Sequence, residues 1–407
     1  MNQEHDFDVI IVGGGAVGGT QALELVRLGY KVAMVEASEP WLGATDPERV
    51  IALSYGSRCH LQRLGLWDDV LAGGVGCIRS IEVRESHQHG MMEMMATEAG
   101  VDALGYVVEM AHIVRAVYTA LAEQVTFFCP ARMQRLEEGE QSITVELLQA
   151  EKVQTLTAKL LIGADGTHSQ VRRMAGIATR GWDHNRFGLV ASVRCERGHA
   201  ERAYECFRHA GPLAFLPLSD DRFSIVWALP PQEAMRMLDL PERMFLKRLQ
   251  RVADEAVLPR SGRLLEVGKR ACFPLELRIA NMYAKGRVVL QGNAAHTLHP
   301  VAGQGLNLGL RDVATFTNLL KREAAHQDVG AAILLSAYAE QRRLDVLAVA
   351  GFTESMLATF GNDVPPLQWL RGRGLDAMQV LPWLREPLMQ HAAGLTEVDV
   401  TEVEGHA

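Results

Sequence analysis

The sequence predicts an α/β fold, with one domain of alternating strands and helices, a second domain built mainly of β-sheet, and a helical C-terminal region. Three observations support this prediction. Residues 7–36 read as a strand, a glycine-rich turn, a helix and a second strand; residues 211–230 alternate in places, as half-buried strands do; and the chain beyond Tyr338 has a helical pattern. At 407 residues, the chain is long enough for two domains with separate cores.

Composition excludes several classes of protein. Hydrophobic residues make up 48% of the chain and charged residues 22%, which is typical of a globular protein. Lys and Arg number 41 against 49 Asp and Glu, a net charge of −8, so no excess of positive charge is available for nucleic acid. The six cysteines are scattered without a CxxC pair, so we predict neither a metal site nor a disulfide scaffold.

The scattered cysteines favour a reducing compartment, and with the N-terminal sequence they predict a cytoplasmic protein. The sequence MNQEHDFDVIIVGGG is acidic before its first apolar run, whereas a signal peptide begins with basic residues. No stretch approaches eighteen uninterrupted apolar residues, so no transmembrane helix is predicted. Peripheral attachment to the inner membrane stays open.

The first motif is the glycine pattern Gly13-x-Gly15-x-x-Gly18 between strand and helix. In a Rossmann-like unit these glycines form a tight turn, let a pyrophosphate approach the backbone, and let the helix pack closely on the strand. The helix N-terminus then attracts the anion. Glu36 ends the second strand, where a carboxylate accepts hydrogen bonds from a ribose hydroxyl. This pattern fits NAD and FAD equally well.

A second motif, KLLIGADGTHSQVR, covers residues 159–172. It reads as an apolar strand, the pair Asp165-Gly166, and a polar turn into a helix. Asp-Gly at a strand end suits a tight turn, and the carboxylate can also hold a sugar hydroxyl.

The third motif is QGNAAHTLHPVAGQGLNLGLRDV, residues 291–313, which follows an apolar strand at residues 287–291. Its small residues leave the backbone bare just before a helix that we expect to begin near Leu306. Such a surface lets a flat ring such as a flavin approach, and a helix N-terminus would stabilise the negative charge of the reduced ring.

The three motifs together resemble the FAD-dependent aromatic hydroxylases of the p-hydroxybenzoate hydroxylase type, over most of the chain. The family's features appear as GGGAVGG, Arg49 in ERVIALS, ADGTHSQVR and GNAAHTLHPVAGQGLNLGLRDV. Within this family the chain looks most like the ubiquinone-biosynthesis hydroxylases, through ALSYGS, LGLW, LGYVVE and GPLAFLPL. The family usually has GDAAH where this chain has Asn293; asparagine keeps one acceptor, and it resembles the branch that hydroxylates polyprenyl methoxyphenols.

The resemblance implies FAD as cofactor, with NAD(P)H, O2 and a prenylated phenol as substrates, and oxygen transfer through a flavin hydroperoxide. No second GxGxxG is present, which suits a family in which NAD(P)H reduces the flavin from a transient site. The cofactor-binding positions that we expect are Gly13, Gly15, Gly18, Glu36, Arg49, Asp165, Gly166, Asn293, Pro300, Gly303, Gly305, Leu306 and Asn307. We name no catalytic acid or base, and we expect His296 and His299 to have positional roles.

The resemblance also suggests a division of the chain. We expect an FAD-binding domain from residues 1–75, 96–182 and 273–340, a substrate domain from residues 76–95 and 183–272, and C-terminal helices in residues 341–407. The Trp-rich segment 365–393 is either an amphipathic tail that meets a membrane or a partner protein, or a helix packed on the FAD-binding domain. Two other functions stay open: a flavin-binding scaffold in a ubiquinone-biosynthetic assembly with other proteins of that pathway, and a hydroxylase of catabolism.

Overall fold

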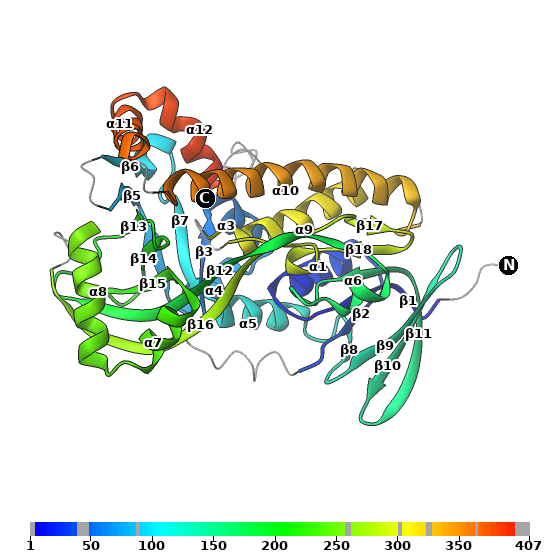
Figure 1. The fold of residues 1–407 in the computed structure, drawn as a ribbon. Helices are drawn as coiled ribbons and strands as arrows, with labels where there is room; N and C mark the ends of the chain where they lie inside the picture. The colour runs from blue at the N-terminus through cyan, green and yellow to red at the C-terminus, as the bar shows by residue number, and fades with distance from the viewer. Residues whose placement is uncertain are drawn as a thin grey trace.

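The structure, a computed structural model, describes residues 5–38, 49–86, 90–256, 262–299, 303–322, 328–362 and 365–394. Its strands form three sheets, and two of these define the two lobes seen in Figure 1. The first lobe holds a mainly parallel sheet and the helices packed on it. The second lobe holds a mainly antiparallel sheet with two helices on one face.

The sheet of the first lobe has eight strands within the described residues, in the order β17-β18-β11-β1-β2-β8, with β10 and β9 added beyond β11. Their bounds are β1 Phe7–Val12, β2 Val32–Val35, β8 Thr126–Phe128, β9 Arg132–Glu138, β10 Ile143–Gln149, β11 Lys152–Gly163, β17 Ala284–Lys285 and β18 Val288–Leu290. Strands β18, β11, β1, β2 and β8 run parallel. Their residues are mostly apolar, as expected for parallel strands whose sheet is covered by helices.

Helices pack around this sheet. They are α1 Ala16–Arg27, α5 Met110–Leu121, α6 Gln170–Met174, α9 Gln304–Arg322 and α10 Ala332–Phe360. Helix α1 packs against both α5 and α9, and α9 packs against α10. The short turn η2 Gly292–Ala294 lies beside α9.

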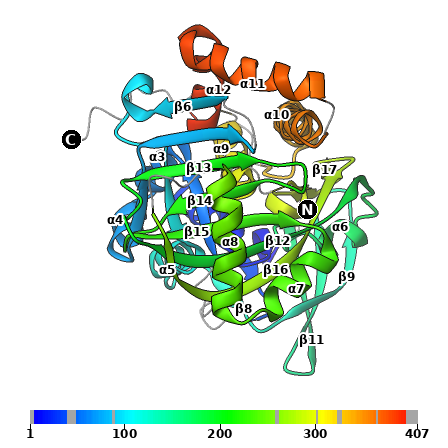
Figure 2. The ribbon, with the colours of Figure 1, turned by 60° about the vertical axis from the view of Figure 1, so that its left-hand side comes forward.

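The sheet of the second lobe has eight strands within the described ranges, in the order β19-β16-β12-β15-β14-β13-β5-β6. Their bounds are β5 Ser80–Glu85, β6 Met91–Met95, β12 Thr179–Cys195, β13 Arg202–Phe207, β14 Leu213–Pro217, β15 Arg222–Leu229, β16 Leu264–Ala280 and β19 His296–Thr297. Helices α7 (Pro231–Asp239) and α8 (Glu242–Ala256) cover its outer face (Figure 2) and share one apolar core with it. The pairing of β16 with β19 joins the sheet to the third sequence motif.

A small sheet in the order β3-β7-β4 lies between the lobes. Its strands are β3 Val50–Ser54, β4 Val75–Ile78 and β7 Gly105–Glu109, and it is accompanied by α3 Tyr55–Arg63, α4 Trp67–Ala72 and η1 Ala96–Ala99. Strand β3 contacts α9, and β4 contacts β14. The small sheet therefore ties the first lobe to the second.

The C-terminal helices α11 (Pro365–Val380) and α12 (Pro382–Ala393) pack on the second lobe and η1. Arg371 forms a buried ion pair with Glu85 of β5, and Arg385 Nη2 lies 2.7 Å from Glu98 Oε1. Trp369 is 62% exposed and Trp383 66%. Both indoles therefore face outward, whereas Leu375, Met389 and Ala393 of the same helices belong to the apolar core of the first lobe. Among the helices of the described part, none is long and apolar enough to cross a membrane.

Candidate functional site

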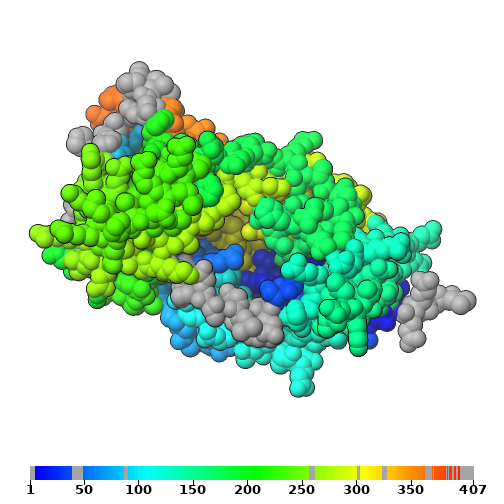
Figure 3. All heavy atoms as spheres, turned by 60° about the horizontal axis from the view of Figure 1, so that its bottom comes forward, coloured from blue at the N-terminus to red at the C-terminus, as the bar shows by residue number. Residues whose placement is uncertain are grey.

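The sequence motifs follow parallel strands whose carboxyl ends meet at one edge of the first sheet. Gly13 follows β1, Glu36 follows β2, Asp165 comes just after β11, and Gly292 comes just after β18. Ligands of open α/β sheets bind at this edge, outside the carboxyl ends of the strands. Figure 3 shows a hollow here, with the dark blue of the first residues and the yellow of the chain near α9 inside it, and with the green of the second lobe along one side.

The three glycines of the first motif differ in what surrounds them. Gly13 has φ +108°, and a Cβ there would lie 2.4 Å from the carbonyl oxygen of Ala164. A Cβ at Gly18 would lie 2.0 Å from the carbonyl oxygen of Gly13. A Cβ at Gly15 would meet nothing within 4 Å. Gly13 and Gly18 are therefore required by the fold itself, whereas Gly15 opens onto free space.

The start of α1 presents backbone amides to that space. Gly15 is the N-cap residue, and no side chain caps the helix. Glu36 Oε2 accepts a hydrogen bond from the Gly14 amide at 2.6 Å, and Glu36 Oε1 accepts one from the Ser38 amide at 3.1 Å. The Tyr118 hydroxyl donates to the Gly14 carbonyl at 3.0 Å. The turn is thus held from both sides while its helix end stays uncapped, which suits an anion.

The two carboxylate oxygens of Asp165 differ in their contacts. Oδ2 accepts hydrogen bonds from the amides of Gln170 at 2.6 Å and Val171 at 3.1 Å, so it supports the start of α6. Oδ1 is buried without a hydrogen-bond partner among the described residues. A buried acceptor of this kind normally has a donor. Gly166, with φ +81°, has open space where a side chain would be.

Helix α9 begins at Gln304, two residues before the predicted start near Leu306. Asn307 ties this end to β3: its Oδ1 accepts from the Ser54 amide at 2.9 Å, and its Nδ2 donates to the carbonyls of Ala52 and Gly303 at 3.0 Å each. A Cβ at Gly303 would lie 2.8 Å from Cβ of Ala52, which explains the glycine.

The remaining predicted positions differ in their surroundings. Gly305 has nothing within 4 Å of a built Cβ, and Leu306 packs against the core of the first lobe. The side chains of Asn293 and Arg49 are exposed. Pro300 lies outside the described residues.

A buried charge network fixes the third motif. Asp312 is fully buried; its Oδ2 accepts from the Gly292 amide at 2.7 Å and lies 2.7 Å from His296 Nε2, and its Oδ1 accepts from Arg342 Nε at 2.6 Å. Burial alone would raise the pKa of Asp312, but His296, Arg342 and the hydrogen bonds together lower it. Asp345 contacts Arg342 from within α10, at 2.7 Å. The positional role expected for His296 agrees with this geometry.

Arg172 links the second motif to the third. Its Nη1 donates to the carbonyl of Ala294 at 2.7 Å, and its Nη2 donates to the carbonyl of Thr167 at 2.8 Å. Sequence reasoning placed Arg172 in a helix but gave it no such role. Arg172 ends the motif ADGTHSQVR, but its bond to Ala294 and the bond of Arg342 to Asp312 join segments far apart along the chain, so neither contact could be predicted from the sequence.

A second group that sequence reasoning missed lies where α10 meets β12. The rings of His184 and His299 are perpendicular with centroids 5.2 Å apart, and His184 Nε2 lies 3.3 Å from Glu354 Oε1. Burial, with a smaller contribution from His184, lowers the pKa of His299 to about 3. His299 is therefore neutral at physiological pH, which fits a positional role.

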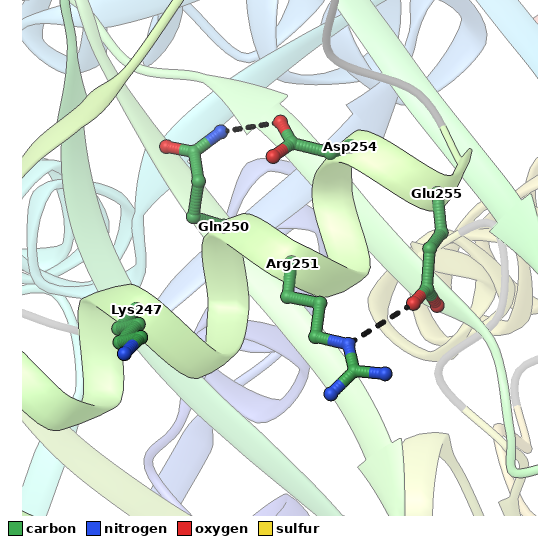
Figure 4. A pocket seen from close by; sticks show the side chains of 5 residues that line it. All are labelled: Lys247, Gln250, Arg251, Asp254 and Glu255. Carbon is green, nitrogen blue, oxygen red and sulfur yellow. Dashed lines mark hydrogen bonds and ion pairs between the residues drawn. The ribbon is translucent and has the colours of Figure 1, made fainter.

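One further surface depression does not belong to the site. It lies on α8 and is lined by Lys247, Gln250, Arg251, Asp254 and Glu255 (Figure 4). These side chains pair along the helix, with Gln250 Nε2 2.7 Å from Asp254 Oδ1. Because a single helix lines it, the depression offers no convergent groups.

The edge of the first sheet fits an extended dinucleotide such as FAD. Open space adjoins Gly15, Gly166 and Gly305, the start of α1 is uncapped, and Asp165 Oδ1 needs a donor. The start of α1 follows β1, and Asp165 and Gly166 follow the neighbouring strand β11. Small residues and bare amides suit a pyrophosphate and a flat ring, whereas a compact substrate alone would leave most of them without a ligand.

Two curated relatives cover nearly the whole chain. The ubiquinone hydroxylase UbiL of Rhodospirillum rubrum is 35% identical over 399 residues, covering 95% of this chain and 89% of its own length. The 3-demethoxyubiquinol 3-hydroxylase of Escherichia coli is 34% identical over 395 residues, covering 95% of this chain and 98% of its own.

Among solved structures, p-nitrophenol 4-monooxygenase of Pseudomonas putida superposes with a TM-score of 0.77 at 19% identity, over 94% of this chain and 96% of that one. This likeness confirms the predicted fold class. The sequence model of the FAD binding domain matches residues 6–353. The chain therefore belongs to the FAD-binding domain family of flavoprotein monooxygenases, and its cofactor is FAD.

Proposed function

We propose that this protein hydroxylates the aromatic ring of a polyprenyl methoxyphenol in ubiquinone biosynthesis, using NAD(P)H and O2. One observation carries the proposal: the bare backbone at the edge of the first sheet faces a hollow bordered by the second lobe, in a chain whose relatives include two ubiquinone hydroxylases. Bound FAD, once reduced by NAD(P)H, supplies the activation of O2 that places one oxygen atom on the ring.

The first lobe would hold the cofactor through backbone more than side chains. The amides at the start of α1, opened by Gly15, would bind the pyrophosphate, and Glu36 would accept from the ribose while bracing the turn. Asp165 Oδ1 would accept a hydroxyl of the cofactor. The start of α9 would face the flavin ring, where its dipole favours negative charge.

The second lobe would bind the phenol and keep water from the reacting ring. We propose that residues 76–95 and 183–272 form this substrate domain. Its sheet is connected to the first lobe in two places: β16 pairs with β19 of the third motif, and the small sheet contacts both β14 and α9. These contacts hold the second lobe next to the third motif. The protein's task is to orient an electron-rich ring carbon toward the cofactor.

We further propose that the C-terminal helices meet the membrane surface that holds the prenylated substrate. Trp369, Val380 and Trp383 are 62%, 75% and 66% exposed, and the guanidinium of Arg373 lies 5.7 Å from the centre of the Trp369 ring. Exposed indoles beside a cation suit a lipid headgroup region. Sedimentation with anionic vesicles should recover the wild type but much less of a Trp369→Ser/Trp383→Ser variant; equal recovery would reject the contact.

The proposed function is tested by mass spectrometry of quinone precursors in cells that lack the protein. Accumulation of a prenyl methoxyphenol, reversed by the wild type but not by Gly15→Val, supports the proposal. If a demethoxy quinone accumulated instead, we would assign the hydroxylation to another position of the ring. Normal ubiquinone would favour a hydroxylase of catabolism, and rescue by Gly15→Val would favour a scaffold role in a biosynthetic assembly.

A further inference from the structure

Glu205 places a carboxylic acid on the inner face of the second lobe's sheet, the face opposite α7 and α8. Glu205 lies on β13 between Tyr204 and Cys206, and these two neighbours belong to the core beneath α7 and α8. Side chains alternate between the two faces of a strand. Glu205 therefore points away from those helices.

The residues two positions to either side show where the inner face lies. Ala203 packs with Ile78 of β4 and Val107 of β7. Phe207 stacks on Phe360 of α10, with ring centroids 4.3 Å apart. Both contacts are made with elements outside the second sheet that link it to the first lobe. Glu205 lies between them, so it is directed to the side on which the two lobes meet.

The inner face is not sealed beside Glu205. Its neighbours across the ladder are Ala214, Val226 and Val190 in turn. Val190 and Val226 are only partly buried, whereas the residues of the same strands that face α7 and α8 are almost fully buried. Glu205 also keeps part of its surface accessible although protein surrounds it. Small apolar side chains therefore surround a partly accessible carboxyl group on this face, which suits a flat aromatic ring.

The carboxyl group of Glu205 lacks a partner within the described part of the chain, where it forms no hydrogen bond or ion pair. The charged residue that shares this face on the next strand, Glu85, is already paired with Arg371. Burial raises the pKa of Glu205 from 4.5 to about 7, with no charged group contributing. A buried polar group without a partner calls for a ligand that provides one.

We infer that Glu205 is the base that accepts the proton of the substrate's phenolic hydroxyl. The phenol O–H bond breaks, its electron pair stays on the phenol oxygen, and the proton forms an O–H bond on the carboxylate. The resulting phenolate is more electron-rich at the ring carbon that receives oxygen. This inference rests on the proposed function, because it requires a phenol in the inner space.

The first test compares Glu205→Gln with wild type as FAD-loaded protein, using a methoxyphenol that carries a single prenyl unit. General-base catalysis contributes about 100-fold or more, so the hydroxylation kcat should fall by at least that factor, while FAD content and NAD(P)H oxidation persist. Glu266→Gln changes an exposed glutamate of the same sheet and serves as the matched control. A Glu205→Gln kcat within about twofold of wild type would overturn the inference.

Two pH measurements separate a base from a structural residue. Wild-type kcat should rise through about pH 7 as Glu205 ionises, and the variant should lose this step. The carboxyl group of Glu205 binds its proton more tightly in the folded state than in the unfolded state. The free energy of unfolding of wild type should therefore fall as the pH rises from about 4.5 to about 7. Glu205→Gln should therefore unfold at a higher urea concentration than wild type at about pH 8. A residue needed only for packing would give a less stable variant and an unchanged pH profile.

Infrared difference spectroscopy separates failure of this inference from failure of the proposed function. Adding the same phenol at about pH 8 should increase the protonated-carboxyl band of wild type but not of Glu205→Gln. If wild type binds the phenol and gains the band without hydroxylating it, the proposed function fails and the proton transfer stands. If wild type hydroxylates the phenol and no band appears, Glu205 is not the base.

Discussion

The two lobes differ in how they arrange the residues of the proposed ligand sites. In the first lobe, glycines and buried hydrogen bonds fix the backbone: Gly13 cannot accept a side chain, and Asp312 accepts from the Gly292 amide. In the second lobe, a sheet presents side chains to its two faces in alternation, and the acid Glu205 lies among the small apolar residues Ala214, Val226 and Val190 of the inner face. On the proposed function, the cofactor would therefore be bound mainly by backbone and the substrate would be met by side chains of the sheet.

The largest effect should come from breaking the network of the first lobe at Asp312. Asp312→Asn leaves Arg342 with one carboxylate fewer in a buried site, so we expect a loss of about 3 to 5 kcal/mol in the free energy of unfolding, together with loss of bound FAD. Urea unfolding and the flavin absorbance measure both. Asp220→Asn removes an exposed pair with Arg222 and should cost under about 1 kcal/mol. If both variants lost the same free energy of unfolding, the buried network would contribute no more to stability than an exposed ion pair does.

The next effect separates two glycines of one motif. Gly15→Val should lower FAD affinity about 100-fold, or about 2.7 kcal/mol, while the apoprotein keeps its stability, because a side chain at Gly15 meets no protein atom. Gly13→Val should fail to fold, since its Cβ would overlap the Ala164 carbonyl and its φ is +108°. Titration of each apoprotein with FAD, beside its urea curve, measures the difference. A Gly15→Val apoprotein as unstable as Gly13→Val would place Gly15 in the fold and not in the site.

The smallest effect should come from the charge of Glu36. Glu36→Gln keeps an acceptor for the Gly14 amide but loses its negative charge, so we expect FAD affinity to fall about tenfold, or about 1.4 kcal/mol. Glu123→Gln, at an exposed position, should leave FAD affinity unchanged. Calorimetric titration with FAD measures both, and unchanged affinity for Glu36→Gln would remove Glu36 from the cofactor site.

Much of the first lobe could be predicted from sequence because backbone constraints restrict residue choice. A turn with φ +108° selects glycine at Gly13, and contact of the α9 start with β3 selects glycine at Gly303. These constraints appear as spacing within a short window. The outward placement of Trp369 and Trp383 could not be predicted in the same way, because it depends on contacts with residues far away in the chain, such as the ion pairs of Arg371 with Glu85 and of Arg385 with Glu98.

Glu205 shows why the proposed base could not be predicted from the sequence. Its role depends on which face of β13 meets the first lobe, and that is set by α7 and α8 covering the other face. Arg172 and Arg342 depend likewise on partners far along the chain, Ala294 and Asp312. Residue patterns within a short window of sequence do not indicate contacts between such distant residues.

The most direct test of the central claim is a single-turnover reaction of the FAD-loaded protein with NAD(P)H, a prenyl methoxyphenol and isotopically labelled O2. Mass spectrometry of the product should show one added hydroxyl group whose oxygen carries the label. A product without label, or oxidation of NAD(P)H that does not depend on the phenol and yields no hydroxylated ring, would contradict the assignment of this chain as a monooxygenase of prenylated phenols.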